Sequence, residues 1–182
     1  MAKVLVPIAD ASEEIEAVCI QDTLVRAGAE VTVASVTGKL LVTMSRGLKI
    51  EADALIEDCT GTAWDAIACP GGMPGAERLA ASAPLVELLK QQVAASKITA
   101  AICASPAVVL AQHNLLPGKA VCYPAPKFKE ILGEKYTEDV VQMDGCVITG
   151  TGPGTSLKFA LKIVETLFGA EKAEEVGKAL LC

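Results

Sequence analysis

The sequence has one histidine and few aromatic residues, and these scarcities exclude whole classes of site. With His113 as the one histidine in 182 residues, a His-rich metal cluster cannot form. The seven cysteines include no Cys-x-x-Cys pair, which argues against structural zinc and against a disulfide framework. We therefore expect most cysteines, with Cys59, Cys122 and Cys146 as examples, to be reduced thiols buried in the core.

Blocks of positive charge and long apolar runs are also missing. The net charge is −6, and no stretch gathers Lys and Arg, which excludes nucleic acid and acidic membrane surfaces as partners. The longest apolar-rich stretch, residues 98–111, is interrupted by Ser105 and Pro106 and is shorter than the roughly 20 residues of a spanning helix. The N-terminus is apolar only as far as Ile8, so neither a signal peptide nor an anchor is expected. We predict a cytoplasmic protein without a membrane partner.

Strand-like and helix-like segments alternate along the chain. About half of the residues are apolar, enough for the core of one domain over residues 1–182. The expected strands are 4–8, 31–34, 66–69, 98–102, 119–123, 140–141 and 147–148. The expected helices are 10–26, 85–95, 104–112, 156–167 and 171–181. Residues 40–42 are expected to pair with 48–50 as a small hairpin at the edge of the sheet. Buried, non-alternating strands followed by helices predict an α/β fold, a mostly parallel sheet with helices on both faces.

Cys103 occupies the junction between the apolar strand 98–102 and the apolar helical stretch 104–112. A turn there lifts the side chain from the sheet edge and points the first free N–H groups of the helix at the sulfur. Such surroundings favour the thiolate over the thiol. The junction therefore predicts a reactive cysteine.

Two other loops are expected beside Cys103, because ligand sites in such sheets lie at the carboxyl ends of strands. The loop after Ile8 leads to Glu16, whose apolar neighbours allow helical rotation to point it inward; a carboxylate facing water, as for Glu13 and Glu14, is the alternative. The glycine-rich segment 70–75 lacks the ending of a P-loop. It either offers N–H groups to an oxyanion at the cysteine or is a bare turn.

Four segments, found in order over essentially the whole chain, carry a resemblance to a known family. They are Glu13-Glu14-Ile15-Glu16, Pro70-Gly71-Gly72, residues 100–106 around Cys103, and Gly152-Pro153-Gly154-Thr155-Ser156. Together they resemble the ThiJ/PfpI superfamily, specifically its parkinsonism-associated, DJ-one-like branch. The resemblance implies a flavodoxin-like three-layer sandwich, a homodimer, a nucleophilic or redox-sensing Cys103, Glu16 as its carboxyl partner, and N–H groups of Gly72 and Ala104 in the site. The expected pocket also includes Gly71, Tyr123 and Pro153. Arg46 and Arg26 either supply positive charge to the pocket, within the chain or across a dimer, or are solvated surface residues.

The residues narrow the activities found in this superfamily. Peptidase relatives place a histidine directly after the cysteine, where this chain has Ala104, and His113 lies about 15 Å farther along by helical rise. What remains is cofactor-free glyoxalase chemistry, from methylglyoxal to lactate, or protein deglycation, with a Cys103 nucleophile and Glu16 as acid and base. Tyr123 stands where the family often has a pocket histidine, and a phenol is a poor base at neutral pH.

The hydrogen bond expected between Glu16 and Cys103 favours a protonated Glu16, whether the protein is an enzyme or a redox sensor. A carboxylate would oppose the thiolate, whereas a protonated carboxyl donates to it, so the two groups are expected to share one proton. The competing hypothesis is a redox sensor or chaperone without catalysis, in which Cys103 oxidises to a sulfinate held by the same donors. Cys19, one turn beyond Glu16, is either a packing residue or a resolving thiol for the oxidised Cys103. Neither hypothesis requires a metal or a cofactor.

Overall fold

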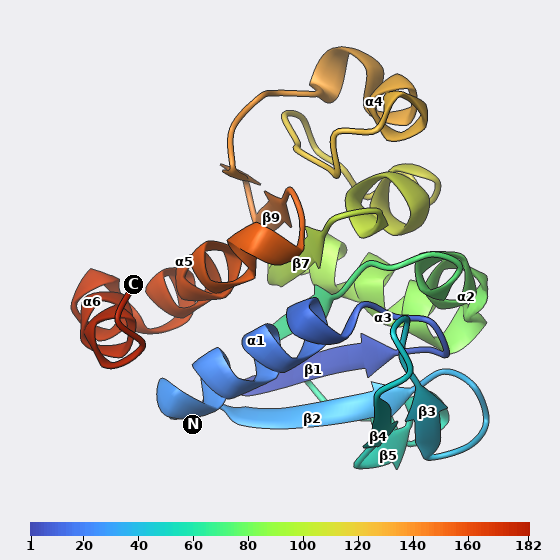
Figure 1. Cartoon of the computed structure of the whole chain (residues 1–182), viewed down its shortest axis with the longest axis horizontal. Coiled ribbons are helices and arrows are strands. Elements are labelled where there is room, and N and C mark those ends of the chain that lie inside the picture. Colours follow the sequence, from blue (N-terminus) through green and yellow to red (C-terminus); the bar gives the residue numbers. More distant parts are fainter.

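The computed structural model describes residues 1–182 and is built on one seven-stranded sheet (Figure 1). The strands are β1 (Lys3–Ile8), β2 (Glu30–Ser35), β5 (Ala54–Leu55), β6 (Ala66–Cys69), β7 (Ile98–Ile102), β8 (Val141–Asp144) and β9 (Val147–Gly150). Their order is β5-β2-β1-β6-β7-β9-β8, and every neighbouring pair is parallel except β8 with β9. This arrangement confirms the predicted α/β fold with a mostly parallel sheet.

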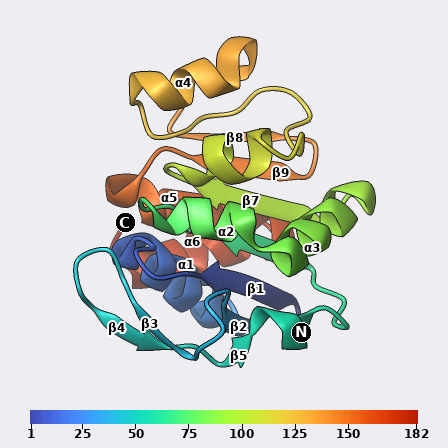
Figure 2. The same ribbon diagram turned by 90° about the vertical axis from the view of Figure 1, so that its right-hand side faces the viewer.

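Helices cover both faces of the sheet (Figure 2). One face carries α1 (Glu14–Arg26), α5 (Ser156–Phe168) and α6 (Ala170–Ala179), and the other carries α2 (Gly75–Ala81), α3 (Ala83–Ala94), a π-helical segment (Pro106–Ala111) and α4 (Pro126–Leu132). Short 3-10 turns lie at Ile56–Cys59, Gly133–Lys135 and Pro153–Thr155. None of these helices combines the length and the apolar character needed to cross a membrane.

Burial on both faces explains the apolar strand sequences. All four residues of β6 are buried, so its side chains contribute alternately to the two cores. Phe159 and Ile20 belong to the core beneath α1 and α5, and Leu89 and Leu110 belong to the core on the opposite face. Because β1, β6 and β7 are adjacent and parallel, their carboxyl ends lie at the same edge of the sheet.

The hairpin and two further segments differ from the sequence prediction. Strands β3 (Leu41–Thr43) and β4 (Lys49–Glu51) pair with each other as a separate sheet, and the edges of the main sheet are β5 and β8. Residues 119–123 form only an isolated bridge, because the Val121 N–H donates to a side chain, Thr149 Oγ1. The expected α-helix over 104–112 is a turn followed by the π-helical segment, which starts at a proline without an N–H donor.

All seven cysteines are free thiols. Cys59 and Cys122 are buried as predicted, whereas Cys146 is only half-buried because it lies in the short turn between β8 and β9.

Candidate functional site

Cys103 directly follows β7 and has a left-handed backbone conformation, with φ at 66°. Its N–H donates to the Gly150 carbonyl at 3.0 Å, and its carbonyl accepts the Tyr123 N–H at 2.7 Å. This conformation costs a non-glycine residue about 1–3 kcal/mol and is kept only where the surroundings enforce it. Hydrogen bonds on both sides of the residue enforce it here, and the side chain is 9% exposed.

Two glycines of the loop after β6 lie directly against Cys103 and the loop after β1. A Cβ on Gly71 would fall 2.7 Å from the Cys103 Cβ, and one on Gly72 would fall 2.5 Å from the Ala11 carbonyl oxygen. Gly72 also has φ at +85°, which disfavours any side chain. The backbone N–H groups of Gly72 and Ala104 face the Cys103 sulfur and lower the pKa of its thiol. The glycine-rich loop is therefore part of the site and not a bare turn.

Glu16, in the first turn of α1, points inward and is completely buried. Its Oε2 accepts the Gly71 N–H at 2.7 Å, its Oε1 has no hydrogen-bond partner, and the carboxyl interacts with the Cys103 thiol. Burial raises the pKa of Glu16 to about 7, although the Gly71 and Cys103 hydrogen bonds act in the opposite direction. A protonated Glu16 at neutral pH would use its unpartnered oxygen as a donor.

The thiol of Cys103 responds to the charge of Glu16. Burial, followed by the Glu16 carboxylate, raises the pKa of Cys103 to about 12, and the N–H groups of Gly72 and Ala104 lower it. The low thiol pKa expected from the sequence is therefore wrong for this site: burial is the largest cause that raises it, and repulsion by the Glu16 carboxylate adds to burial. Once Glu16 takes up a proton, the repulsion ends and the carboxyl can donate to the sulfur. Glu16 and Cys103 therefore titrate as a coupled pair that can share one proton.

A cavity of about 390 Å³ opens above the cysteine. The residues lining it are Glu13, Ser45, Arg46, Gly72, Met73, Cys103, Ala104, Tyr123, Ala125, Lys127, Phe128 and Pro153. The structure thus brings Arg46, Tyr123 and Pro153 to Cys103, and Gly71 lies beneath it. No three His, Cys, Asp or Glu side chains are arranged to hold a metal ion.

Arg26 and His113 lie away from this cavity. Arg26 ends α1, pairs with Asp22 at 2.7 Å and does not line the cavity of its own chain, as the surface alternative expects. His113 is half-buried, and its Nε2 is 2.9 Å from the Ala80 carbonyl oxygen. The alanine after the cysteine and this remote histidine leave Cys103 without an imidazole base.

Glu13 is the site residue that the sequence did not single out. It is the N-cap of α1, its Oε2 accepts the Glu16 N–H at 2.8 Å, and its own N–H donates to the Gly71 carbonyl at 3.0 Å. The side chain is 8% exposed and lines the cavity, contrary to the water-facing carboxylate expected by default. Its place directly before the first turn of α1 is compatible with a cap, but glutamate is not one of the usual capping residues and the sequence does not show whether a cap is buried.

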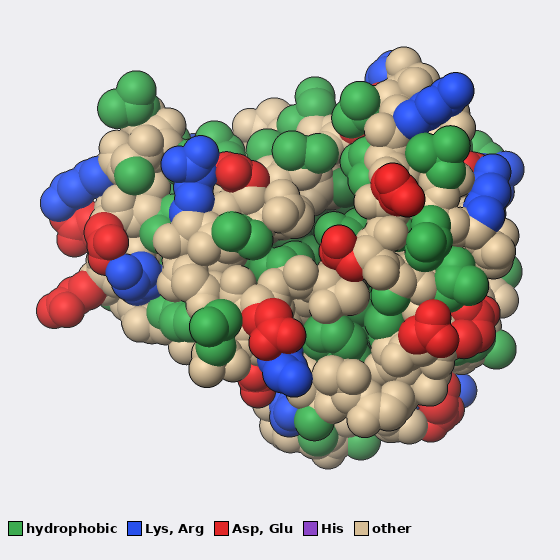
Figure 3. Space-filling model, turned by 90° about the horizontal axis from the view of Figure 1, so that it is seen from below, with side chains coloured by type: hydrophobic (Ala, Val, Ile, Leu, Met, Phe, Trp, Pro, Cys, Tyr) green, Lys and Arg blue, Asp and Glu red, His purple; other side chains and the backbone are tan.

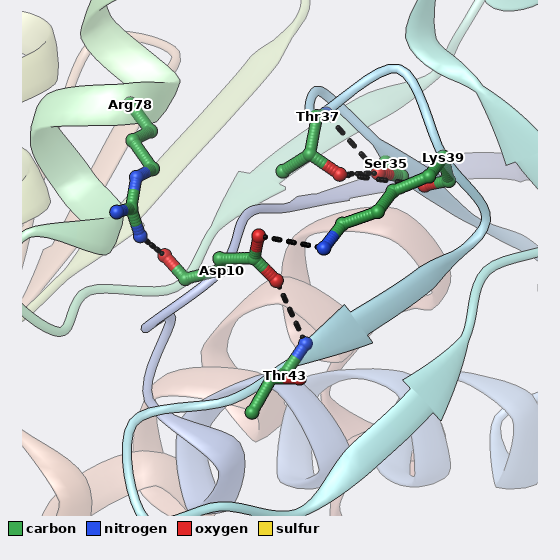
Figure 4. A network of polar contacts seen from close by, with 6 residues as sticks. All are labelled: Asp10, Ser35, Thr37, Lys39, Thr43 and Arg78. Carbon is green, nitrogen blue, oxygen red and sulfur yellow. Dashed lines mark hydrogen bonds and ion pairs between the residues drawn. The ribbon is translucent and has the colours of Figure 1, made fainter.

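Carboxylates fasten the β3–β4 hairpin to the loop after β1. Asp10 Oδ1 accepts the Thr43 N–H at 2.8 Å, its Oδ2 lies 3.1 Å from Lys39 Nζ, and Arg78 donates to the Asp10 carbonyl (Figure 4). The hydrogen bond from Thr43 is the largest cause that lowers the pKa of Asp10. The same loop is thereby tied to the hairpin on one side and to α2 on the other.

Glu14 completes this attachment and places Arg46. Its two carboxylate oxygens accept the Ser45 hydroxyl at 2.5 Å and the Arg46 N–H at 2.7 Å. Burial works against ionisation, but these hydrogen bonds hold the pKa of Glu14 below its ordinary value. The turn of the hairpin, with Arg46, is consequently held at the mouth of the cavity.

Comparison with known proteins agrees with this geometry. The model of the DJ-1/PfpI family matches residues 2–166. The chain belongs to the DJ-1/PfpI family. Protein DJ-1 homolog B of Arabidopsis thaliana is 48% identical over 180 residues, which are 98% of this chain and 41% of that protein. Glutathione-independent glyoxalase DJR-1.2 of Caenorhabditis elegans is 41% identical over 180 residues, 98% of this chain and 95% of that protein.

Solved structures extend the likeness to the fold. The structure named "Toxoplasma gondii DJ-1, oxidized" has a TM-score of 0.96 and 49% sequence identity, with 100% of this chain and 98% of that chain covered. The chain spans less than half the length of the two Arabidopsis relatives that it matches. The relatives that the chain matches thus differ in length.

The contact between Gly71 and Cys103 predicts the effect of a single methyl group. Gly71→Ala should slow alkylation of Cys103 by iodoacetamide at least tenfold, because the new Cβ would overlap the cysteine Cβ and the Ile102 carbonyl. Gly61→Ala is the matched control, since nothing lies within 4 Å of its added Cβ and its rate should not change. Equal rates in Gly71→Ala and the wild type would show that the contact does not position the thiol.

The raised pKa of Glu16 predicts how stability depends on pH. The folded state holds this proton up to about pH 7, whereas the unfolded chain releases it near 4.5, so Glu16 lowers the stability progressively across that window. Glu16→Gln removes the titration and keeps an oxygen for the Gly71 N–H. Relative to the wild type, its free energy of unfolding in urea should rise by about 3 kcal/mol between pH 4.5 and pH 8. A pH-independent difference between the two proteins would contradict a shifted Glu16.

Proposed function

We propose that the protein is a cofactor-free glyoxalase that protects against reactive carbonyl compounds by converting methylglyoxal to lactate. The observation that carries the proposal is the buried Glu16 carboxyl beside Cys103, with a pKa near neutrality. Such a group can give and take a proton at physiological pH. The named glyoxalase among the relatives supports this choice of substrate class.

The reaction uses the groups already described. The Cys103 thiolate attacks the aldehyde carbon of methylglyoxal, a C–S bond forms, and the carbonyl oxygen takes the proton of Glu16. The N–H groups of Gly72 and Ala104, which face the sulfur, are placed to hold this oxygen as its charge develops. The product of the step is a hemithioacetal on Cys103.

Glu16 then moves a proton between adjacent carbons. Its carboxylate removes the C–H proton of the hemithioacetal carbon, which leaves an enediolate with the charge on the former ketone oxygen. Glu16 returns the proton to the neighbouring carbon, and the hydroxyl proton on the sulfur-bearing carbon passes to the former ketone oxygen. This isomerisation yields a lactoyl thioester without net oxidation. Water hydrolyses the thioester, which releases lactate and restores the Cys103 thiol. Tyr123, in the cavity and 46% exposed, can orient the substrate by donating a hydrogen bond.

Protein deglycation is a related reaction of the same pair. It begins with attack of the same thiolate on a carbonyl adduct, which must enter by the mouth that Arg46 and Lys127 line. The free state of all the cysteines accords with a reducing compartment, and we place the activity in the cytoplasm.

Oxidation sensing, with or without a chaperone role, is the second candidate function. The donors that face the sulfur, the N–H groups of Gly72 and Ala104 and a protonated Glu16, could equally bind the oxygens of a Cys103 sulfinate. The solved structure of an oxidised relative supports this alternative. The sensor requires no turnover, which separates it from the glyoxalase.

A homodimer is the assembly we propose. Ile15, Val18 and Val25 on α1 expose about half of their surface, as does Leu48 at the hairpin. A groove of about 230 Å³ between α1, β2 and the hairpin is lined by Val18 and Ile50, among others. The side of the molecule that carries β2 and β5 also shows hydrophobic side chains among charged ones (Figure 3). A second copy of the chain would cover this apolar surface.

Incubation of the reduced protein with methylglyoxal, without glutathione, tests the enzyme. Lactate followed by NMR should form with the wild type, and Cys103→Ser and Glu16→Gln should each lower kcat by at least about a hundredfold, since nucleophile and acid/base partner act as a unit. Cys146→Ser, away from the cavity, should retain the wild-type rate. A stable adduct or no reaction would reject the glyoxalase in favour of the sensor, and abundant activity in Cys103→Ser would reject both.

Substitution on α1 tests the dimer. Val18→Asp places a charge in the exposed apolar surface and should convert a dimer to a monomer in analytical ultracentrifugation. Glu30→Gln, at an exposed position at the start of β2, is the control and should leave the sedimentation coefficient unchanged. A monomeric wild type at micromolar concentration would refute the proposed assembly.

A further inference from the structure

Glu13 has an unusual position for a helix-capping carboxylate, since it is nearly buried and contacts both loops of the site. Its Oε2 accepts the Glu16 N–H at 2.8 Å, and its N–H donates to the Gly71 carbonyl. A Cβ on Gly72 would fall 2.6 Å from the Glu13 nitrogen, which shows how closely the backbones approach. Glu13 therefore cannot move without moving Glu16 or the loop that provides the N–H donors.

The two glutamates have no cation bound to them. Neither Glu13 nor Glu16 forms an ion pair, and the cationic groups that line the cavity, Arg46 and Lys127, are solvent-exposed. The remaining titratable neighbours in the cavity are Cys103 and Tyr123, with Cys19 one turn along α1. Two buried carboxyl groups within one helical turn, joined through the Glu16 N–H, thus lack an ion-pair partner.

We propose that Glu13 is a positioning residue whose negative charge keeps the shared proton on Glu16 and so leaves the charge on the sulfur of Cys103. This proposal rests on the Cys103–Glu16 pair of the proposed function and adds a third group to it. The hydrogen bond from the Glu16 N–H to Glu13 fixes the position of the Glu16 backbone at the start of α1. The charge of Glu13 influences whether Glu16 or Cys103 holds the shared proton.

The direction of the effect follows from the charges that act on each group. Burial is the main cause that raises the pKa of both Glu16 and Cys103. The charge of Glu13 adds a smaller increase to the pKa of Glu16, weaker than the opposing hydrogen bonds, and the charge of Glu16 adds to the pKa of Cys103. With Glu13 ionised, a second carboxylate beside it is disfavoured. The balance then shifts toward the state with a neutral Glu16 and a thiolate, and away from the state with a carboxylate and a thiol. A neutral residue at position 13 should shift this balance back toward the thiol.

Three variants separate charge from structure. Glu13→Gln removes the charge but keeps an oxygen that can accept the Glu16 N–H, and Glu13→Asp keeps both charge and capping ability. Glu77→Gln is the charge control, because Glu77 is an exposed carboxylate in the first turn of α2, after the same glycine-rich loop. Thermal unfolding of each protein verifies that α1 remains folded.

The readouts are the titration of Glu16, followed by infrared spectroscopy of ¹³C-labelled glutamate, and the rate of Cys103 alkylation by iodoacetamide as a function of pH. In Glu13→Gln we expect the Glu16 midpoint at lower pH and alkylation at pH 7 slower by about threefold or more, since half a pKa unit is a factor of about three. Glu13→Asp and Glu77→Gln should resemble the wild type.

Several results would overturn the proposal. They are an unshifted Glu16 midpoint in folded Glu13→Gln, an equal shift in Glu77→Gln, or a Glu13→Asp profile like that of Glu13→Gln. Neither readout depends on turnover. A protein that forms no lactate but shows the expected shift would reject the glyoxalase and still support the role of Glu13.

Discussion

The hydrogen bond from the Gly71 N–H to Glu16 Oε2 joins two loops that lie 55 residues apart, and the site depends on it. It fixes the carboxyl next to the sulfur of Cys103 and orients the loop whose next N–H, that of Gly72, faces the same sulfur. The sheet order makes the contact possible, because β1, β6 and β7 are adjacent. A change in strand order would separate the three groups although each local sequence stayed the same.

The site combines two costs that the rest of the protein must offset. Cys103 has a backbone conformation that side chains disfavour, and Glu16 is a carboxyl group without contact with water. Both costs become useful in the proposed chemistry. The strained turn exposes the sulfur to the cavity, and burial brings the carboxyl into the pH range in which it exchanges protons.

The fold and the central pair could be predicted from the sequence for definite physical reasons. Fully buried parallel strands leave continuous apolar runs, as in β6 and β7, and a cysteine between such a strand and a helical stretch marks the turn. Glu13 could not be predicted, because a buried cap and an exposed cap have the same sequence. The sequence left Arg26 as either a pocket or a surface residue, because its orientation depends on its partner Asp22. The segment 119–123 has a strand-like composition, but its donors bind Cys103 and Thr149.

The β3–β4 hairpin has no backbone pairing with the main sheet, and it reaches the cavity through contacts with the loop after β1. Arg46 and Ser45 line the cavity from this hairpin, while Cys103 and Glu16 are supported from the sheet and α1. The loop after β1 and Glu14 of α1 thus connect the hairpin to the helix that carries Glu16. A change in the length of this loop would therefore displace the mouth of the cavity and the buried carboxyl together, so that the two parts cannot diverge independently.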